Sequence, residues 1–266
     1  GRRVRKFPRP IVVVSGCLEL TPCRWDGARI PCPLILRLKP FARLIPVCPE
    51  EAIGLGTPRD PIRLLRGGTS TVLIQPATGA RLTRKMRGFA KNYLEGIPAA
   101  DGFILKSRSP SCGVRDAKIF SDARANHPLG KGPGLFARAV LDRFGPLAID
   151  DEARLSSPAA RDHFLTKLFT LAGFRRVKER PSMPALRRFL AENRLLLMAH
   201  STRAARRIER LASNPDHLPA PSLIAAVEPH LRLALSRRVP KARRGLFALP
   251  YPEALRHFTE AASSPG

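Results

Sequence analysis

Residues 11–17 of the chain have the sequence IVVVSGC, a short β-branched run that ends in serine, glycine and cysteine. A continuous apolar run of this length is typical of a strand that is buried on both faces of a parallel sheet. Three further runs have the same character, at residues 44–47, 72–75 and 103–105. We therefore expect these four segments to form a sheet, with Cys17 at the carboxyl end of the first strand.

Helical patterns lie between and after the strand-like runs. Apolar residues recur at helical spacing over residues 82–97 and 136–144, and each segment ends at a proline or a Gly-Pro pair. Strands that alternate with helices predict an α/β domain with a Rossmann-like, mostly parallel sheet covered on both sides. Two glycine-rich segments, at residues 54–56 and 130–134, lack both the P-loop spacing and the dinucleotide fingerprint, so we interpret them as turns.

The strand-like runs stop near residue 150, and helical spacing continues beyond it. Apolar residues at that spacing predict helices around residues 164–171, 186–211 and 223–231. The predicted architecture is an α/β domain at residues 8–150, followed by a smaller all-α domain at residues 151–266.

Composition limits the class of protein. The chain has 266 residues, 44% of them hydrophobic, which is enough to bury a core. No stretch approaches the roughly eighteen consecutive apolar residues of a transmembrane helix, so we expect no membrane partner. Five cysteines are too few for a disulfide scaffold, and an odd number leaves at least one thiol unpaired. These counts favour a reducing compartment, and we expect a cytoplasmic protein.

The chain is strongly basic, with 47 Lys and Arg, 21 Asp and Glu, and a formal net charge of +26. Basic residues are densest in the carboxyl-terminal third, in clusters at residues 175–180, 203–210 and 237–244. Such clusters attract polyanions by releasing counterions from phosphates, which makes RNA or another polyanion a candidate partner of the helical domain. A solvated surface carries the same charge without a partner, and only 6% of the residues are aromatic and able to stack on bases.

Three cysteines share one position relative to the predicted strands. Cys17 and Cys48 each end a strand, and Cys112 follows a third strand through a short loop. The carboxyl ends of parallel strands lie at one edge of a sheet, where ligand crevices form. Three thiolates without a fourth suit a [4Fe-4S] cluster with one open iron, whereas the absence of a C-x-x-C pair leaves a structural zinc or unligated buried thiols as alternatives. We expect Cys23 to lie near this site and Cys32 to have no part in it.

Three long motifs surround these cysteines: residues 15–18 (SGCL) with 23–27 (CRWDG), residues 46–50 (PVCPE) with 53–56 (IGLG) and 58–59 (PR), and residues 101–113 (DGFILKSRSPSCG). These motifs resemble the DUF523 family, whose best understood members are thiouracil desulfurases. They occur in the order of the family and span about residues 8–150. Trp25 stands where that family usually has tyrosine.

The resemblance implies a [4Fe-4S] cluster held by Cys17, Cys48 and Cys112. It also implies non-redox removal of sulfur from a small thiolated pyrimidine or a related thioamide, with the sulfur captured by the open iron. The competing hypothesis is a non-catalytic, basic, nucleic-acid-associated protein in which the cysteines hold a structural metal.

Two carboxylates are the predicted acid–base and hydrogen-bonding groups. Replacing C–S by C–O requires a water molecule and proton transfer at the ring, and Glu50 follows Cys48 closely enough to act as the general base. Asp26, in a Trp-Asp-Gly turn, would hydrogen-bond a pyrimidine N–H. The alternative for both is an ordinary turn carboxylate.

Two serines and two cations complete the predicted site. Ser109 and Ser111 flank Pro110 beside Cys112, and their hydroxyls would bind the substrate carbonyl or a cluster sulfide. Lys106 and Arg59 would bind the substrate and place positive charge beside an anionic cluster. Turn capping and surface solvation are the alternatives for these residues.

The remainder of the chain resembles the DUF1722 family at residues 150–155 (DDEARL) and 195–201 (LLLMAHS). Asn193 stands where that family has histidine, its later His-x-Asn segment is not found, and the domain is short. We interpret the acids at residues 150–152 as residues of a helix N-terminus, and His200 as a packed histidine.

Overall fold

The computed structural model describes residues 6–243 and 245–256, which divide into two compact units. The sheet unit comprises residues 11–145 and 149–157, and the helical unit comprises the described residues among 1–10, 146–148 and 158–258. The predicted α/β class with a helical carboxyl-terminal region is confirmed. Among the described helices, none is both long enough and apolar enough to cross a membrane.

A four-stranded sheet forms the centre of the sheet unit. Its strands, in spatial order, are β2 (Arg43–Val47), β1 (Ile11–Ser15), β6 (Gly102–Leu105) and β9 (Ala148–Asp151). Strand β1 pairs in parallel with both β2 and β6, and Ser15 lies opposite Val47. The valines of β1 and all of β6 are buried, as their continuous apolar sequence predicts. This register brings the residues that follow β1 and β2 to the same edge of the sheet.

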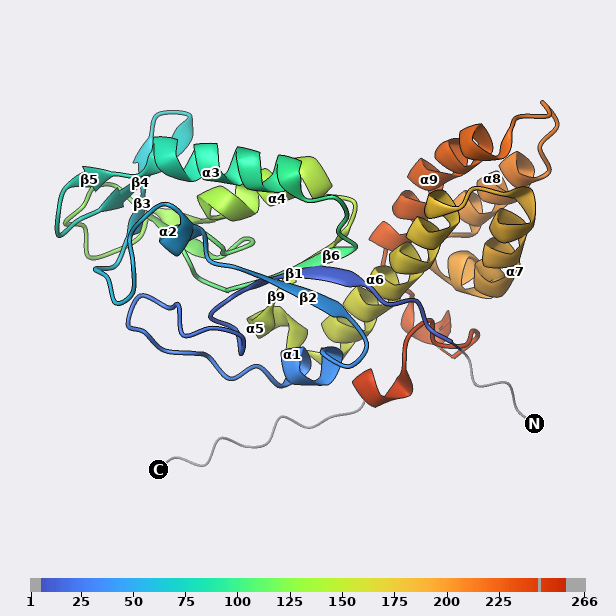
Figure 1. Ribbon diagram of the computed structural model, residues 1–266, viewed down its shortest axis with the longest axis horizontal. Helices are drawn as coiled ribbons and strands as arrows, with labels where there is room; N and C mark the ends of the chain where they lie inside the picture. Colours follow the sequence, from blue (N-terminus) through green and yellow to red (C-terminus); the bar gives the residue numbers. More distant parts are fainter. Residues whose placement is uncertain (1–5, 244, 257–266) are drawn as a thin grey trace. The chain divides into compact units, whose positions relative to one another are not determined.

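Helices cover both faces of this sheet, as predicted. Helices α3 (Thr83–Gly96) and α4 (Leu135–Phe144) pack against each other on one side, and α1 (Pro33–Leu38) and α5 (Glu152–Leu155) lie on the other (Figure 1). The short helix α2 (Pro49–Ala52) follows β2 directly.

A second, five-stranded sheet corrects the prediction of a single sheet. Its strands, in spatial order, are β5 (Ala80–Arg81), β4 (Ser70–Gln75), β3 (Arg63–Gly67), β7 (Ala117–Phe120) and β8 (Gly130–Gly132). Residues 72–75 therefore belong to an antiparallel hairpin with β3, because a tight turn at Gly67–Ser70 reverses the chain. The predicted turn at residues 130–134 is also wrong in part, since its first three residues form β8, which pairs antiparallel with β7.

The helical unit contains four long helices, α6 (Pro158–Glu179), α7 (Met183–His200), α8 (Thr202–Ala212) and α9 (Ala220–Ser236). Two single-turn 3₁₀ helices follow, η1 (Lys241–Arg243) and η2 (Glu253–Leu255). The predicted continuous helix over residues 186–211 is wrong, because Ser201 ends α7 and its hydroxyl accepts the Ala204 N–H to cap α8.

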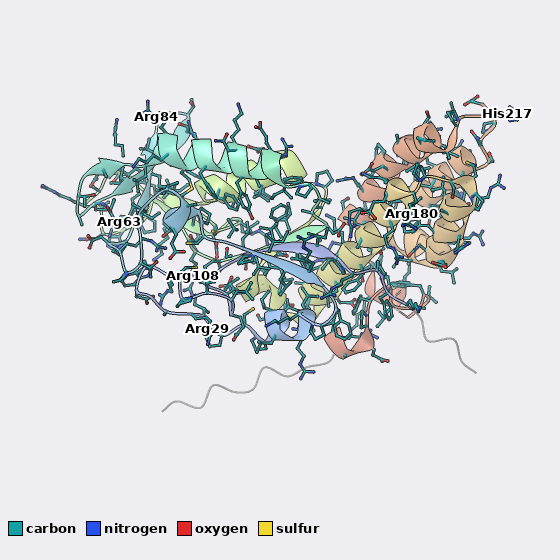
Figure 2. All side chains as sticks on the ribbon, viewed as in Figure 1. Arg29, Arg63, Arg84, Arg108, Arg180 and His217 are labelled. Carbon is teal, nitrogen blue, oxygen red and sulfur yellow. The ribbon has the colours of Figure 1, made fainter. Side chains whose placement is uncertain are left out.

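Helix α8 is amphipathic. It buries two alanines and an isoleucine, and it exposes the arginines of the predicted 203–210 cluster, namely Arg203, Arg206, Arg207 and Arg210. Charged side chains likewise project from both units (Figure 2). Arg244, at the end of the third predicted cluster, lies outside the described residues. A polyanion partner for these clusters stays a prediction.

Candidate functional site

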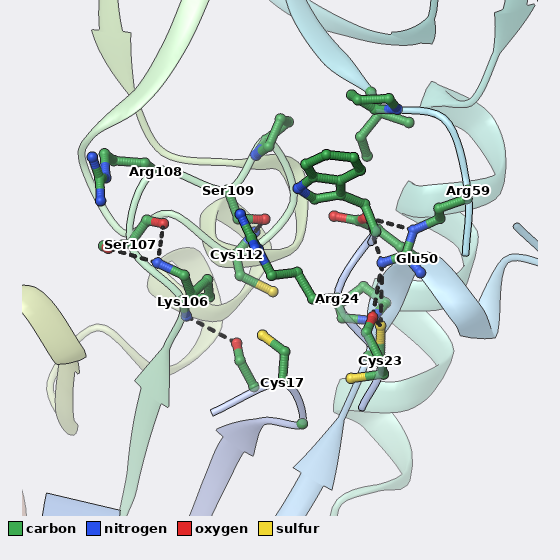
Figure 3. A pocket seen from close by; sticks show the side chains of 18 of the residues that line it. Cys17, Cys23, Arg24, Glu50, Arg59, Lys106, Ser107, Arg108, Ser109 and Cys112 are labelled. Atoms are coloured by element: carbon green, nitrogen blue, oxygen red, sulfur yellow. Dashed lines mark hydrogen bonds and ion pairs between the residues drawn. The ribbon is translucent and has the colours of Figure 1, made fainter. Parts of the chain in front are cut away.

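A cavity of about 490 Å³ lies at the carboxyl edge of the parallel sheet. Residues that follow β1, β2 and β6 line it, together with residues of β3 and β7 from the second sheet. Four of the five cysteines are among the lining residues: Cys17, Cys23, Cys48 and Cys112. Figure 3 shows the sulfur atoms of Cys17 and Cys112 pointing toward the same space. We call this space the thiol cavity, and its volume lies within the range of small-molecule sites.

The end of β1 is shaped by a close approach that only glycine permits. The Gly16 N–H donates to the Val47 carbonyl oxygen at 2.8 Å, which fastens the chain after β1 to the end of β2. A Cβ atom on Gly16 would lie 2.5 Å from the Thr21 hydroxyl oxygen and 3.0 Å from the Cys23 sulfur. Glycine at this position therefore allows Cys23 to lie beside Cys17.

The loop that carries Cys112 is fixed in the same manner by a distant glycine. Gly134, at the N-cap of α4, donates its N–H to the Gly113 carbonyl oxygen at 2.8 Å. A Cβ atom on Gly134 would lie 2.5 Å from the carbonyl oxygen of Ser111. The Ser109 hydroxyl oxygen accepts the N–H groups of Ser111 and Cys112 at 3.2 and 3.1 Å. Ser109 thus lines the cavity and also caps this turn.

The thiols lie in a poorly hydrated environment. Cys23 and Cys112 are 3% and 5% exposed, and Cys17 and Cys48 are half-buried. The hydrogen bond with Cys23, followed by burial, raises the pKa of the Cys48 thiol, and burial raises the pKa of Cys112. The hydrogen bond with Cys17 raises the pKa of Cys23. Metal ligation requires thiolates, so bound metal or nearby cations must offset this preference for the protonated form.

Two arrangements of ligands are present around the cavity. The Cys23 and Cys48 sulfurs and a Glu51 carboxylate oxygen lie within 4.8 Å of one another, the only such group among the described residues. That spacing suits a single ion. The predicted ligands Cys17, Cys48 and Cys112 all line the cavity. Their sulfur atoms do not all lie within 4.8 Å of one another, so this set is more widely spaced.

Glu50 is held at the cavity wall by two partners. Arg59 donates from Nε to one carboxylate oxygen at 2.9 Å and forms an ion pair through Nη2 at 2.8 Å, while the Ser111 hydroxyl donates to the other oxygen at 3.0 Å. The side chains of Arg59 and Glu50 are only 4% and 13% exposed. Ser111 is fully buried and does not line the cavity, so the structure places it behind Glu50 rather than facing a ligand.

Arg59 also contacts the cysteine region directly. Its Nη2 donates to the Cys23 carbonyl oxygen at 3.0 Å and lies 3.9 Å from the Cys48 sulfur. The guanidinium therefore links the predicted general base to two of the four thiol-bearing segments.

Lys106 is joined to a residue whose role the sequence did not indicate. Its ammonium donates to the Glu152 carboxylate at 2.6 Å, and Ser107 donates to the same carboxylate from its hydroxyl at 2.6 Å and its N–H at 2.8 Å. The sequence predicted Glu152 only as an acid at a helix N-terminus, which describes its place in α5. Its contact with the site spans more than 40 residues, and no local pattern encodes it.

Asp26 is not among the residues that line the cavity, and its contact with a substrate stays a prediction. Its carboxylate pairs with Arg24 and accepts the Ala28 N–H at 3.0 Å, which is the turn-forming arrangement. The neighbouring Trp25 does line the cavity and is 43% exposed, with the Arg24 guanidinium 5.4 Å from its ring centroid.

The charge around the cavity is predominantly positive. Glu50 is the one carboxylate among the described lining residues, which also include six cationic side chains: Arg24, Arg59, Arg63, Lys106, Arg108 and Lys118. Arg59 pairs with Glu50, and Arg24 and Lys106 pair with acids outside the lining. A site of this kind stabilises thiolates and other anionic groups.

A model of the family described as 2-thiouracil desulfurase matches residues 12–152, which is more than half of the chain. The chain belongs to the 2-thiouracil desulfurase family. The match includes every residue that lines the thiol cavity, so the cavity lies within the part of the chain that defines the family. The match ends at residue 152, and the resemblance of the remainder to the DUF1722 family stays a prediction.

Two individual proteins are similar to this member of the desulfurase family. The uncharacterized protein YbbK of Bacillus subtilis (strain 168) is 35% identical over 111 residues, which cover 39% of this chain and 73% of YbbK. A solved structure described as the [4Fe-4S]-dependent thiouracil desulfidase TudS is 28% identical, with a TM-score of 0.41, over 55% of this chain and 93% of that one.

Proposed function

We propose that the protein removes sulfur from a thiolated pyrimidine or a related thioamide, using a [4Fe-4S] cluster held by Cys17, Cys48 and Cys112. The observation that carries this proposal is the meeting of three strand-end thiols in one cavity that also contains Glu50. Membership of the 2-thiouracil desulfurase family supports the reaction class.

The donor set fits an iron–sulfur cluster. Cysteine thiolates are the usual ligands of such clusters, and three of them leave one iron without a protein ligand. The wider spacing of Cys17, Cys48 and Cys112 leaves room for a multinuclear group, in contrast to the compact Cys23, Cys48 and Glu51 set. When bound, a cluster with an open iron would supply a thiophilic Lewis-acid position for the substrate sulfur.

The reaction balances as a hydrolysis. A water oxygen forms a bond to the ring carbon, the C–S bond breaks, and the two protons of that water leave with the sulfur as hydrogen sulfide, with no electron transfer. In this proposal the Glu50 carboxylate accepts a proton from the attacking water and delivers it to the departing sulfur. Arg59 and the Ser111 hydroxyl hold this carboxylate at the wall of the cavity, so that its oxygens keep one orientation.

Two further lining residues have supporting roles. The ion pair between Lys106 and Glu152 holds the chain after β6 in place beside the thiols. Trp25 provides a partly exposed aromatic surface on which a planar pyrimidine would stack. Ser109 supports the Cys112 turn with its hydroxyl, so its effect on turnover would be indirect.

The test is metal analysis combined with turnover. Protein purified without oxygen should contain about four irons and about four acid-labile sulfides per chain, and it should convert 2-thiouracil to uracil with release of sulfide. Cys32, which is buried at the N-cap position of α1 outside the cavity, provides the matched control, and Cys32→Ser should retain the iron. One equivalent of zinc without labile sulfide would contradict the proposal and support the compact single-ion set.

A further inference from the structure

A second cavity, of about 670 Å³, lies in the sheet unit on the other face of the five-stranded sheet. Consecutive side chains of β7 point to opposite faces of the sheet: Lys118 and Phe120 line the thiol cavity, whereas Ile119 lines the second cavity. The two cavities therefore lie on opposite faces of the five-stranded sheet. The β3–β4 hairpin, α3, β8 and α4 form its walls. We call this second cavity the basic groove, and nothing in the proposed desulfuration uses it.

The groove gathers cations from four separate elements. They are Arg66 of β3, Arg87 and Lys91 of α3, Lys131 of β8 and Arg138 of α4. Within the part of the chain that the structure describes, no carboxylate lies within ion-pair distance of any of these five.

Some other exposed basic residues of the chain do pair with an acid, whereas the groove brings five cations without an acidic partner among the described residues onto one concave surface. Lys178, for example, pairs with Glu228 at 2.8 Å, and Arg194 pairs with Glu209 at 2.8 Å. Asp142 is the one described acidic residue that lines the groove. Like charges that converge on a concave surface repel one another and focus a positive potential there, which favours occupation by an anion.

The uncharged donors of the groove indicate the kind of anion. Thr69, Ser70 and Thr71 of the β3–β4 hairpin line the groove, and the Ser70 hydroxyl donates to the Gly67 carbonyl oxygen at 3.4 Å. Cationic side chains combined with hydroxyls are the usual contacts to phosphate oxygens. None of the described lining residues is aromatic, so the groove offers no surface for stacking a base. The chemistry of the wall therefore favours phosphates over bases.

We propose that the basic groove binds a chain of consecutive phosphate groups. The spread of five cations over four elements, around a cavity of about 670 Å³, exceeds what a single phosphate would contact. The same chemistry is available from a small polyphosphorylated ligand and from the backbone of a single-stranded nucleic acid, and two probes distinguish these sources.

The experiment uses the full chain with sodium tripolyphosphate, followed by calorimetry, and with a fluorescent oligouridylate, followed by anisotropy. The groove variant carries Arg87→Gln, Lys91→Gln and Lys131→Gln, all at exposed positions. The control variant carries Arg81→Gln, Arg84→Gln and Lys85→Gln, which removes equal charge from the end of β5 and the start of α3, where Arg84 projects outward (Figure 2). Circular dichroism verifies that both variants are folded.

The groove variant should bind at least roughly tenfold more weakly than the wild type at low salt, and the control no more than about threefold more weakly. With the oligouridylate, losing three phosphate contacts should also reduce the slope of log K against log salt by about two. Weakening of tripolyphosphate binding alone would identify a small ligand as the source, and weakening with both probes or with the strand alone would identify a nucleic acid. Equal weakening in both variants, or no binding by the wild type, would overturn the proposal.

Discussion

Replacing Glu50 by glutamine removes one charge from the thiol cavity and leaves the shape of the side chain unchanged. The amide oxygen of the new side chain can face Arg59, and its NH₂ group can face Ser111, whose hydroxyl is able to accept instead of donate. The hydrogen bonds persist, but Arg59, with a 4% exposed side chain, loses its counter-charge. We expect a stability loss of roughly 2–3 kcal/mol, less than the roughly 3–5 kcal/mol for truncating a buried pair.

The effect of this substitution on catalysis should be larger than its effect on stability, and the two can be measured separately. If Glu50 transfers the proton, Glu50→Gln should lower kcat about 10²–10⁴-fold while the chain keeps its iron and labile sulfide. Glu51→Gln is the matched control, because Glu51 is exposed, accepts a hydrogen bond from Thr57 and does not line the cavity. The assay follows sulfide release and uracil formation at substrate saturation, alongside thermal unfolding. Wild-type turnover in Glu50→Gln would refute its role as the base, and loss of iron would reduce Glu50 to a structural residue.

Three further predictions test the ligands and the helical unit. Serine at any one of the three proposed cluster ligands should abolish iron retention in a colorimetric assay, while Cys32→Ser should leave it intact. Cys23→Ser should also retain iron, and a loss shared by Cys23→Ser and Glu51→Gln would favour the compact single-ion set. Burial, with a smaller effect of His200, lowers the pKa of His163 to about 4. In the unfolded chain this histidine takes up its proton near pH 6.5, so its contribution to folding stability should be complete above that pH. That contribution should fall by up to roughly 3 kcal/mol as the pH drops to 4. Urea unfolding at several pH values measures the loss, and the variant His163→Phe should not show this contribution.

The meeting of the thiols could be predicted because it follows from local sequence and one topological rule. The apolar runs before Cys17 and Cys48 indicate buried parallel strands, and parallel strands place their carboxyl ends at one edge. The structure puts both residues, with Cys112, on a single cavity. The resemblance to a desulfurase family rests on the same residues, so the local and the family arguments agree.

The second sheet could have been anticipated in part. Residues 63–75, RLLRGGTSTVLIQ, contain two strand-like runs around a Gly-Gly pair, which is a typical hairpin pattern. The parallel pairing of β3 with β7 joins residues more than 50 positions apart, and no local pattern specifies it. The same applies to Glu152, whose contact with Lys106 depends on the complete sheet.

The two predicted substrate-binding cations are each neutralised by a carboxylate. Arg59 pairs with Glu50 and Lys106 pairs with Glu152, so each pair contributes little net charge to the cavity. Their geometry fits a positioning role, in which Arg59 orients the proposed base and Lys106 stabilises the strand end beside the thiols. The positive field of the cavity must therefore come from other residues.

Those residues belong mainly to the second sheet. Arg63 of β3 donates to the carbonyl oxygens of residues 123 and 125 and lies 4.6 Å from the Phe120 ring centroid, so its charge has no acidic partner among the described residues. Lys118 of β7 also lacks an ion pair within the described chain, and both side chains line the cavity. The parallel sheet thus brings the thiols together, and the five-stranded sheet lines the same cavity with two cations that have no acidic partner among the described residues. A search of the sequence limited to the cysteine motifs misses this contribution, because the residues that make it lie between those motifs.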